Sequence, residues 1–106
     1  MTPVRFAPEV SDELAEAVLW YEARRPGLGS EFLDEVQAIL PLIGTGPRSF
    51  PRLQDVDERL EIRRALLARF PYALVFLVRE DELRVLAVAH AKRRPEYWLT
   101  RVGGTR

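Results

Sequence analysis

The segment from Val85 to Trp98, VLAVAHAKRRPEYW, joins an aliphatic run to side chains that can bind anions or transfer protons. His90 is the only histidine of the chain and Lys92 is the only lysine. An imidazole with an ordinary pKa of about 6.5 exchanges protons near neutral pH, and cationic side chains form strong hydrogen bonds with phosphate and carboxylate oxygens. The sequence therefore predicts an anion-binding surface at a strand end, with the candidates His90, Lys92, Arg93, Arg94, Tyr97 and Trp98.

Each of these residues also has an ordinary structural interpretation. His90 at a strand end can hydrogen-bond a loop carbonyl, and Tyr97 and Trp98 can pack a terminal helix onto the sheet. Arg63 and Arg64 are neighbours in a predicted strand, so their side chains point to opposite faces. At most one of the two shares a face with the site, and we include Arg64 among the candidate target-binding residues.

The composition is that of a single globular domain over residues 1–106. Apolar residues make up 47% of the chain and charged residues 30%, which is ordinary for a folded protein. The absence of cysteine excludes disulfides, thiolate metal sites and cysteine nucleophiles. No apolar run approaches the roughly 20 residues that span a bilayer, and the N-terminus lacks a signal-peptide pattern. We therefore expect a soluble, cytoplasmic protein without membrane contact.

No cofactor or metal is expected from the sequence. Glu13, Glu16 and Glu22 are most simply a solvated helix face, because their spacing is not that of paired metal ligands. The segment RPGLGS lacks the lysine and the preceding strand of a phosphate-binding glycine loop.

The net charge of zero conceals a marked asymmetry along the chain. Residues 1–58 carry eleven acids against five bases, a balance of −6, and residues 59–106 carry eleven bases against five acids, a balance of +6. A two-sided charge distribution of this kind favours a basic face that approaches nucleic acid or an acidic partner.

Periodicity predicts two helices in the first half of the chain. Ser11 is expected to cap a helix that ends near Arg24, with Leu14, Ala17, Val18 and Tyr21 at helical spacing. A second helix should begin near Gly29 or Ser30, with an apolar stripe of Phe32, Val36, Ile39, Leu40 and Ile43. Pro41 should kink this helix or end it early, because proline removes a helical hydrogen bond. Residues 44–58 are rich in glycine, proline and aspartate, which indicates a long loop.

Strand patterns dominate the second half. Residues 61–69 alternate between two faces, and residues 72–78, YALVFLV, are apolar enough for a central strand that is covered on both faces. A charged turn over residues 79–82 should connect this strand to its partner over residues 83–89. Together with a short strand over residues 4–6 and a short helix after Pro95, the order is strand, helix, helix, loop, three-strand meander and terminal helix.

This order resembles the RelE/ParE superfamily of toxins from type II toxin-antitoxin modules. The resemblance covers roughly Glu9 to Trp98, and its motifs, in order, are WYE at 20–22, RPGLG at 25–29, Phe32 with Glu35, Pro47 with Pro51, IRR at 62–64, FPY at 70–72 and VLAVAH-x-x-R-x-P-x-YW at 85–98. It implies a small α+β fold in which an N-terminal strand and a helical hairpin pack on a curved antiparallel β-sheet, followed by a short C-terminal helix.

The resemblance also implies a partner and two alternative targets. The partner is a small cognate antitoxin, which would form a toxin-antitoxin hetero-oligomer. ParE-like members poison DNA gyrase, and for such a toxin Arg64, Lys92, Arg93, Arg94 and Trp98 would bind the target. RelE-like members are ribosome-dependent messenger RNA endoribonucleases, for which His90, Arg93 and Tyr97 would be catalytic.

The composition favours the gyrase alternative. Enzymes that act on RNA inside the ribosome work among phosphates and are usually strongly basic, whereas this chain has one lysine and an acidic N-terminal half. We therefore expect a ParE-like growth inhibitor of the plasmid-stabilisation type, with the ribonuclease as the alternative. A decayed toxin that acts only as a binding module is a third possibility.

Overall fold

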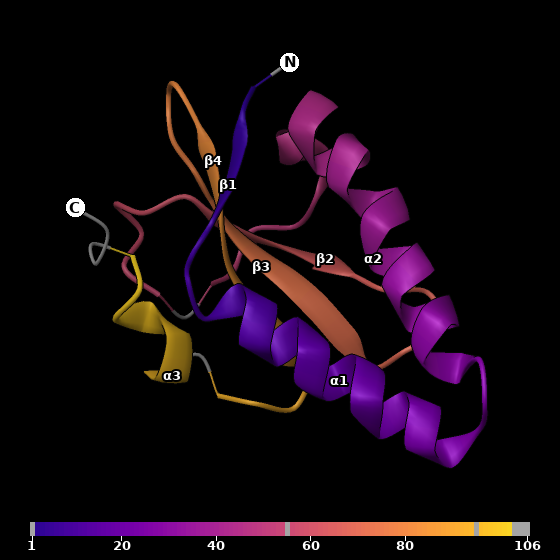
Figure 1. Cartoon of the computed structure of the whole chain (residues 1–106). Helices are drawn as coiled ribbons and strands as arrows, with labels where there is room; N and C mark the ends of the chain where they lie inside the picture. The colour runs from indigo at the N-terminus through magenta and orange to yellow at the C-terminus, as the bar shows by residue number, and fades with distance from the viewer. Residues whose placement is uncertain (1, 55, 95, 103–106) are drawn as a thin grey trace.

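The computed structural model of the chain describes residues 2–54, 56–94 and 96–102. Its elements are β1 (Val4–Phe6), α1 (Val10–Arg24), α2 (Leu28–Thr45), the 3-10 turn η1 (Pro47–Ser49), β2 (Ile62–Leu66), β3 (Tyr72–Val78), β4 (Leu83–His90) and α3 (Glu96–Leu99). The two long helices lie side by side on one face of the sheet, and α3 lies apart from them near the C-terminus (Figure 1). The predicted α+β fold and its element order are confirmed.

The sheet has four strands in the order β1-β4-β3-β2. Strands β2, β3 and β4 form the predicted antiparallel meander, with Tyr72 opposite His90 at one end. Strand β1 adds to β4 in parallel, with Val4 opposite Leu83, so the complete sheet is mixed. The two inner strands β3 and β4 are buried over most of their length, as their continuous apolar sequences predict.

Two apolar cores lie on opposite faces of this sheet. The core on the helix side contains aromatic contacts such as Tyr21 stacked on Phe32, with ring centroids 5.3 Å apart. The core on the other face contains Trp98 from α3, which is 3% exposed and packs with Ile62 and Leu86. The packing role predicted for Trp98 is therefore confirmed. Pro95, which was expected to start α3, lies outside the described residues.

The turn between α1 and α2 explains why WYE and RPGLG occur together. The Glu22 carboxylate accepts hydrogen bonds from the backbone N–H groups of Gly27 at 2.8 Å and Gly29 at 3.0 Å. Gly27 is the N-cap residue of α2 and Gly29 lies in its first turn, where backbone donors lack helical partners. A Cβ on Gly29 would lie 2.6 Å from the Val18 carbonyl oxygen, so only glycine allows the two helices to cross this closely. Glu22 is exposed, as predicted for a solvated helix face, and its carboxylate also caps the start of α2.

The prediction for Ser11 is wrong, and of the two outcomes expected at Pro41, a kink or an early end, the early end is not found. Ser11 does not cap α1, because the helix already begins at Val10, and the Ser11 hydroxyl instead donates to the Pro8 carbonyl at 3.5 Å. Helix α2 does not end early at Pro41 but continues to Thr45. Pro41 and Gln37 are both exposed, so water can reach the Gln37 carbonyl that proline leaves without a helical partner.

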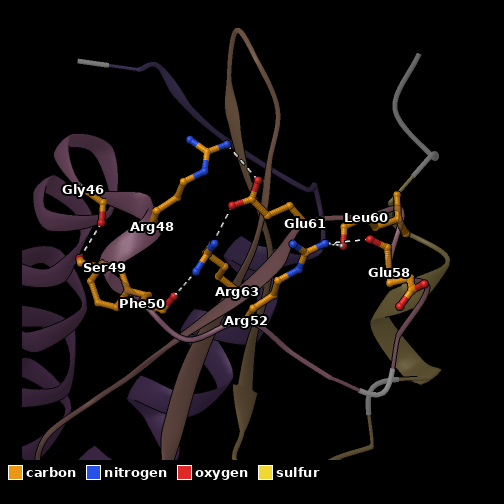
Figure 2. Close-up of polar contacts among 9 residues, drawn as sticks. All are labelled: Gly46, Arg48, Ser49, Phe50, Arg52, Glu58, Leu60, Glu61 and Arg63. Carbon is orange, nitrogen blue, oxygen red and sulfur yellow. Dashed lines mark hydrogen bonds and ion pairs between the residues drawn. The ribbon is translucent and has the colours of Figure 1, made fainter.

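The predicted long loop after α2 is shorter and more ordered than expected. Its first residues belong to α2, Pro47–Ser49 form η1, and Arg52 pairs with Arg63 as an isolated antiparallel bridge. The Arg63 guanidinium donates to the Phe50 carbonyl at 2.6 Å and pairs with Glu61 at 2.8 Å, as Figure 2 shows. The loop therefore lies along the outer edge of β2 and protects it from pairing with another chain.

Among the described residues, no helix has the length and apolar character needed to cross a membrane.

Candidate target-binding site

The candidate site is built on the turn that follows β4. The His90 carbonyl accepts the Arg93 backbone N–H at 2.9 Å, and His90 Nδ1 accepts the Lys92 backbone N–H at 3.2 Å. The imidazole ring meets the Tyr72 ring edge-on, with centroids 5.4 Å apart. His90 thus ends β4, and its carbonyl and Nδ1 accept the hydrogen bonds that hold the turn. Its Nε2 takes no part in these bonds.

A small pocket brings together part of the predicted set. It encloses about 90 Å³ on the sheet face opposite α1 and α2, and Arg64, His90, Arg93 and Trp98 contribute to its wall. The Nε atom of Arg64 is buried and has no hydrogen-bond partner among the described residues. An unpaired buried donor is costly, so this atom destabilises the fold and contributes no hydrogen bond to it. Arg63 points to the other side of the strand, as predicted.

The remaining candidates lie around this pocket and do not form its wall. Lys92 and Arg94 are exposed on the turn. Tyr97 is half-buried, and the Arg93 guanidinium carbon lies 3.8 Å from the centre of its ring. Burial, reinforced by the nearby Glu13 carboxylate, raises the pKa of Tyr97 to about 12. Its hydroxyl therefore stays protonated at neutral pH and is not available as a base there.

A polar network that sequence reasoning missed holds the C-terminal segment against the sheet. Strands β3 and β4 shift register at Val75 and Phe76, which leaves Leu86 as an extra residue in β4. The guanidinium of Arg101 donates to the Leu86 carbonyl at 2.9 Å and to the Glu13 carboxylate at 2.9 Å. The second Glu13 oxygen accepts the Val88 backbone N–H at 3.0 Å.

This network corrects the interpretation of Glu13 as a solvated helix residue. Its side chain is only 18% exposed and that of Arg101 only 11% exposed. The two residues stand 88 positions apart, so no local pattern in the sequence indicates that they meet. By satisfying backbone groups at the bulge, they fix the segment that carries Tyr97 and Trp98.

The described residues contain no group of three or more histidine, aspartate or glutamate side chains placed to hold a metal ion.

The fold agrees with a family match that covers most of the chain. Residues 4–95 match the family described as "ParE toxin of type II toxin-antitoxin system, parDE". Because the match covers most of the chain, this protein belongs to the ParE toxin family of type II toxin-antitoxin systems. The predicted resemblance to the RelE/ParE superfamily is thereby confirmed.

A solved structure is similar in fold. It is described as "Chromosomal ParDE TA system from P. aeruginosa", with a TM-score of 0.70 and 18% sequence identity. The similarity covers 85% of this chain and 96% of that chain. No curated protein matches this sequence significantly.

Proposed function

We propose that this protein inhibits growth by acting on DNA gyrase and that a small cognate antitoxin neutralises it. The ParE family match supports the toxin class. That match carries the proposal, because the matched family is that of ParE toxins. The Arg93 guanidinium covers the Tyr97 ring, and the raised pKa of Tyr97 makes its hydroxyl a poor general base near neutral pH. An inhibitor that binds gyrase needs no general base.

A messenger RNA endoribonuclease is the second candidate, because one observation favours it. The pocket of about 90 Å³ combines His90 with the guanidinium groups of Arg64 and Arg93, which would stabilise the charge on a phosphate. Such an enzyme would use His90 for proton transfer. A decayed toxin that only binds a partner is the third candidate, and expression without growth arrest would favour it.

Induction of the protein in cells separates these candidates. We expect double-strand DNA breaks and a DNA-damage response, while translated messenger RNA stays intact. The purified protein should also inhibit DNA supercoiling by purified gyrase. His90→Ala and Tyr97→Phe should each keep growth inhibition within about threefold of the parent, because neither residue performs proton chemistry in a binding mechanism.

The opposite pattern would overturn the gyrase proposal. Rapid loss of translated messenger RNA with codon-phased cuts, together with intact DNA, would establish the endoribonuclease. In that case His90→Ala should lower cutting by about a hundredfold or more, as expected for loss of a general acid or base.

The antitoxin is proposed to bind an apolar groove between β1 and the helical hairpin. The groove encloses about 420 Å³, and apolar side chains such as Phe6, Leu14, Val36 and Leu40 form most of its wall. An amphipathic helix inserts its apolar face into grooves of this kind. Phe6 is 49% exposed, so a partner that covers it would remove substantial apolar surface from water.

Phe6→Arg is expected to weaken the complex with the antitoxin encoded beside this gene by at least tenfold. The loss follows from the roughly 1.5–3 kcal/mol gained when a large apolar side chain is buried. The dissociation constant can be measured by titration calorimetry. Leu42→Arg is the matched control, because Leu42 is 58% exposed on α2 and does not line this groove. Equal affinities for both variants would place the antitoxin elsewhere.

A further inference from the structure

A third hollow, which shares only His90 with the pocket at Arg64, opens between α1 and the sheet. It encloses about 640 Å³, and the residues that define its chemistry are Glu13, Glu16, Trp20, Tyr21, Tyr72 and His90. Tyr72 begins β3 and His90 ends β4, and the two are direct neighbours in the sheet. Helix α1 crosses the sheet at this end and supplies the opposite wall (Figure 1).

The walls of this cavity are aromatic. Tyr72 meets both His90 and Tyr21 edge-on, with centroid separations of 5.4 Å and 6.0 Å. Trp20 is 52% exposed, so its ring is accessible to a partner at the mouth of the cavity. The Trp20 ring already makes one cation–π contact, with Arg24 Cζ 3.9 Å from its centroid. Arg24 does not line the cavity.

The charge in the cavity is negative. Glu13 and Glu16 are the charged residues of its wall, and no arginine or lysine lines it. Glu13 is already paired with Arg101, whereas Glu16 is exposed and has no hydrogen bond or ion pair with any described residue. The pKa of Tyr72 is raised by burial and then by Glu16, and the Glu16 effect exceeds the opposing effect of Arg93. Glu16 is therefore the free carboxylate nearest to the aromatic rings of this cavity.

We propose that this cavity binds the guanidinium group of an arginine side chain from a protein partner. Aromatic rings attract cations over their faces, and tryptophan does so most strongly. A planar guanidinium also stacks on rings and donates hydrogen bonds to a carboxylate in a fixed geometry, which the compact ammonium of lysine does not. Trp20 and Tyr72 provide the rings, and Glu16 provides the free carboxylate.

This surface is distinct from the two surfaces already proposed. The pocket at Arg64 is cationic and suits an anionic target, and the groove at Phe6 is apolar. The guanidinium cavity adds an acidic and aromatic surface on the other side of His90. The inference does not depend on whether gyrase is the target, because it concerns the chemistry of the bound side chain.

The probe for the test is the blocked tripeptide acetyl-Gly-Arg-Gly-amide, titrated into the full-length protein and followed by NMR. We expect saturable shifts of the Trp20 indole N–H and the His90 ring signals, and much smaller shifts with the uncharged citrulline analogue. Glu16→Gln should weaken binding about two- to fivefold, as an exposed ion pair allows. Trp20→Ala should weaken it about threefold or more, since a cation over a ring is lost.

Asp34→Asn is the matched control, because it removes one exposed negative charge from α2, outside the cavity. It should leave the affinity unchanged. Equal shifts with the citrulline analogue, shifts that avoid Trp20 and His90, or full affinity in Trp20→Ala would each overturn the assignment. Equal binding of the lysine analogue would overturn the preference for guanidinium. Because the readout is peptide binding, it is independent of growth inhibition and of the gyrase proposal.

Discussion

Glu13→Ala is expected to destabilise the protein by about 2–4 kcal/mol, the largest effect that we anticipate from a single polar substitution. Glu13 accepts the Val88 backbone N–H and pairs with Arg101. Its removal leaves a backbone donor without a partner and a mostly buried guanidinium without its counter-charge. Leaving these two groups unpaired costs more stability than their interactions with Glu13 contribute, because both groups remain buried away from water.

The stability of Glu13→Ala can be measured by urea unfolding. Asp12→Ala is the matched control, since Asp12 lies in the same helical turn but is exposed, and it should change stability by about 0.5 kcal/mol or less. Arg101→Ala should also destabilise, and the double variant should cost less than the sum of the two single variants, because the residues interact directly. Additive effects would show that the ion pair has no energetic role.

Hydrogen exchange gives a local readout of the same network. In Glu13→Ala the Val88 amide should exchange faster, and Trp98 should become more exposed as α3 loosens. A uniform loss of protection throughout the sheet would instead indicate global destabilisation without a special role in docking α3.

If the proposed gyrase mechanism holds, the double substitution Arg64→Met with Arg93→Met is expected to reduce inhibition of gyrase by about a hundredfold or more. A hydrogen bond to a charged group contributes about 1.5–3 kcal/mol, so the loss of two arginines that contact an anionic target lowers affinity by at least this factor. Arg64 and Arg93 line the same pocket. Methionine keeps much of the aliphatic volume of each side chain, although the contact of the Arg93 guanidinium with the Tyr97 ring is lost.

The double variant should remain folded, so that a loss of inhibition reports on binding. The buried Arg64 Nε has no hydrogen-bond partner among the described residues, so removing it relieves a desolvation cost and does not break a bond. The supercoiling assay should be run beside Arg5→Ala, which removes one exposed arginine from β1 at the other edge of the sheet. Unchanged inhibition by the double variant would exclude this pocket as the target-binding site.

The amino-acid sequence by itself determined the elements and most of their order. Helical spacing placed α1 and α2, and the run YALVFLV with the turn after Val78 placed the central hairpin. These features were predictable because each depends on neighbours within a few positions, where side-chain periodicity follows backbone geometry. The cationic turn after His90 could be predicted for the same reason, because its residues are consecutive in the sequence.

Only the tertiary structure decided which distant groups meet. The parallel pairing of β1 with β4 joins residues from the two ends of the chain, and the continuation of α2 past Pro41 depends on burial of Ile43 in the core. The contact between Glu13 and Arg101 depends on a bulge at Leu86. The physical reason is that such contacts are selected by the packing of the whole domain, which no local sequence pattern encodes.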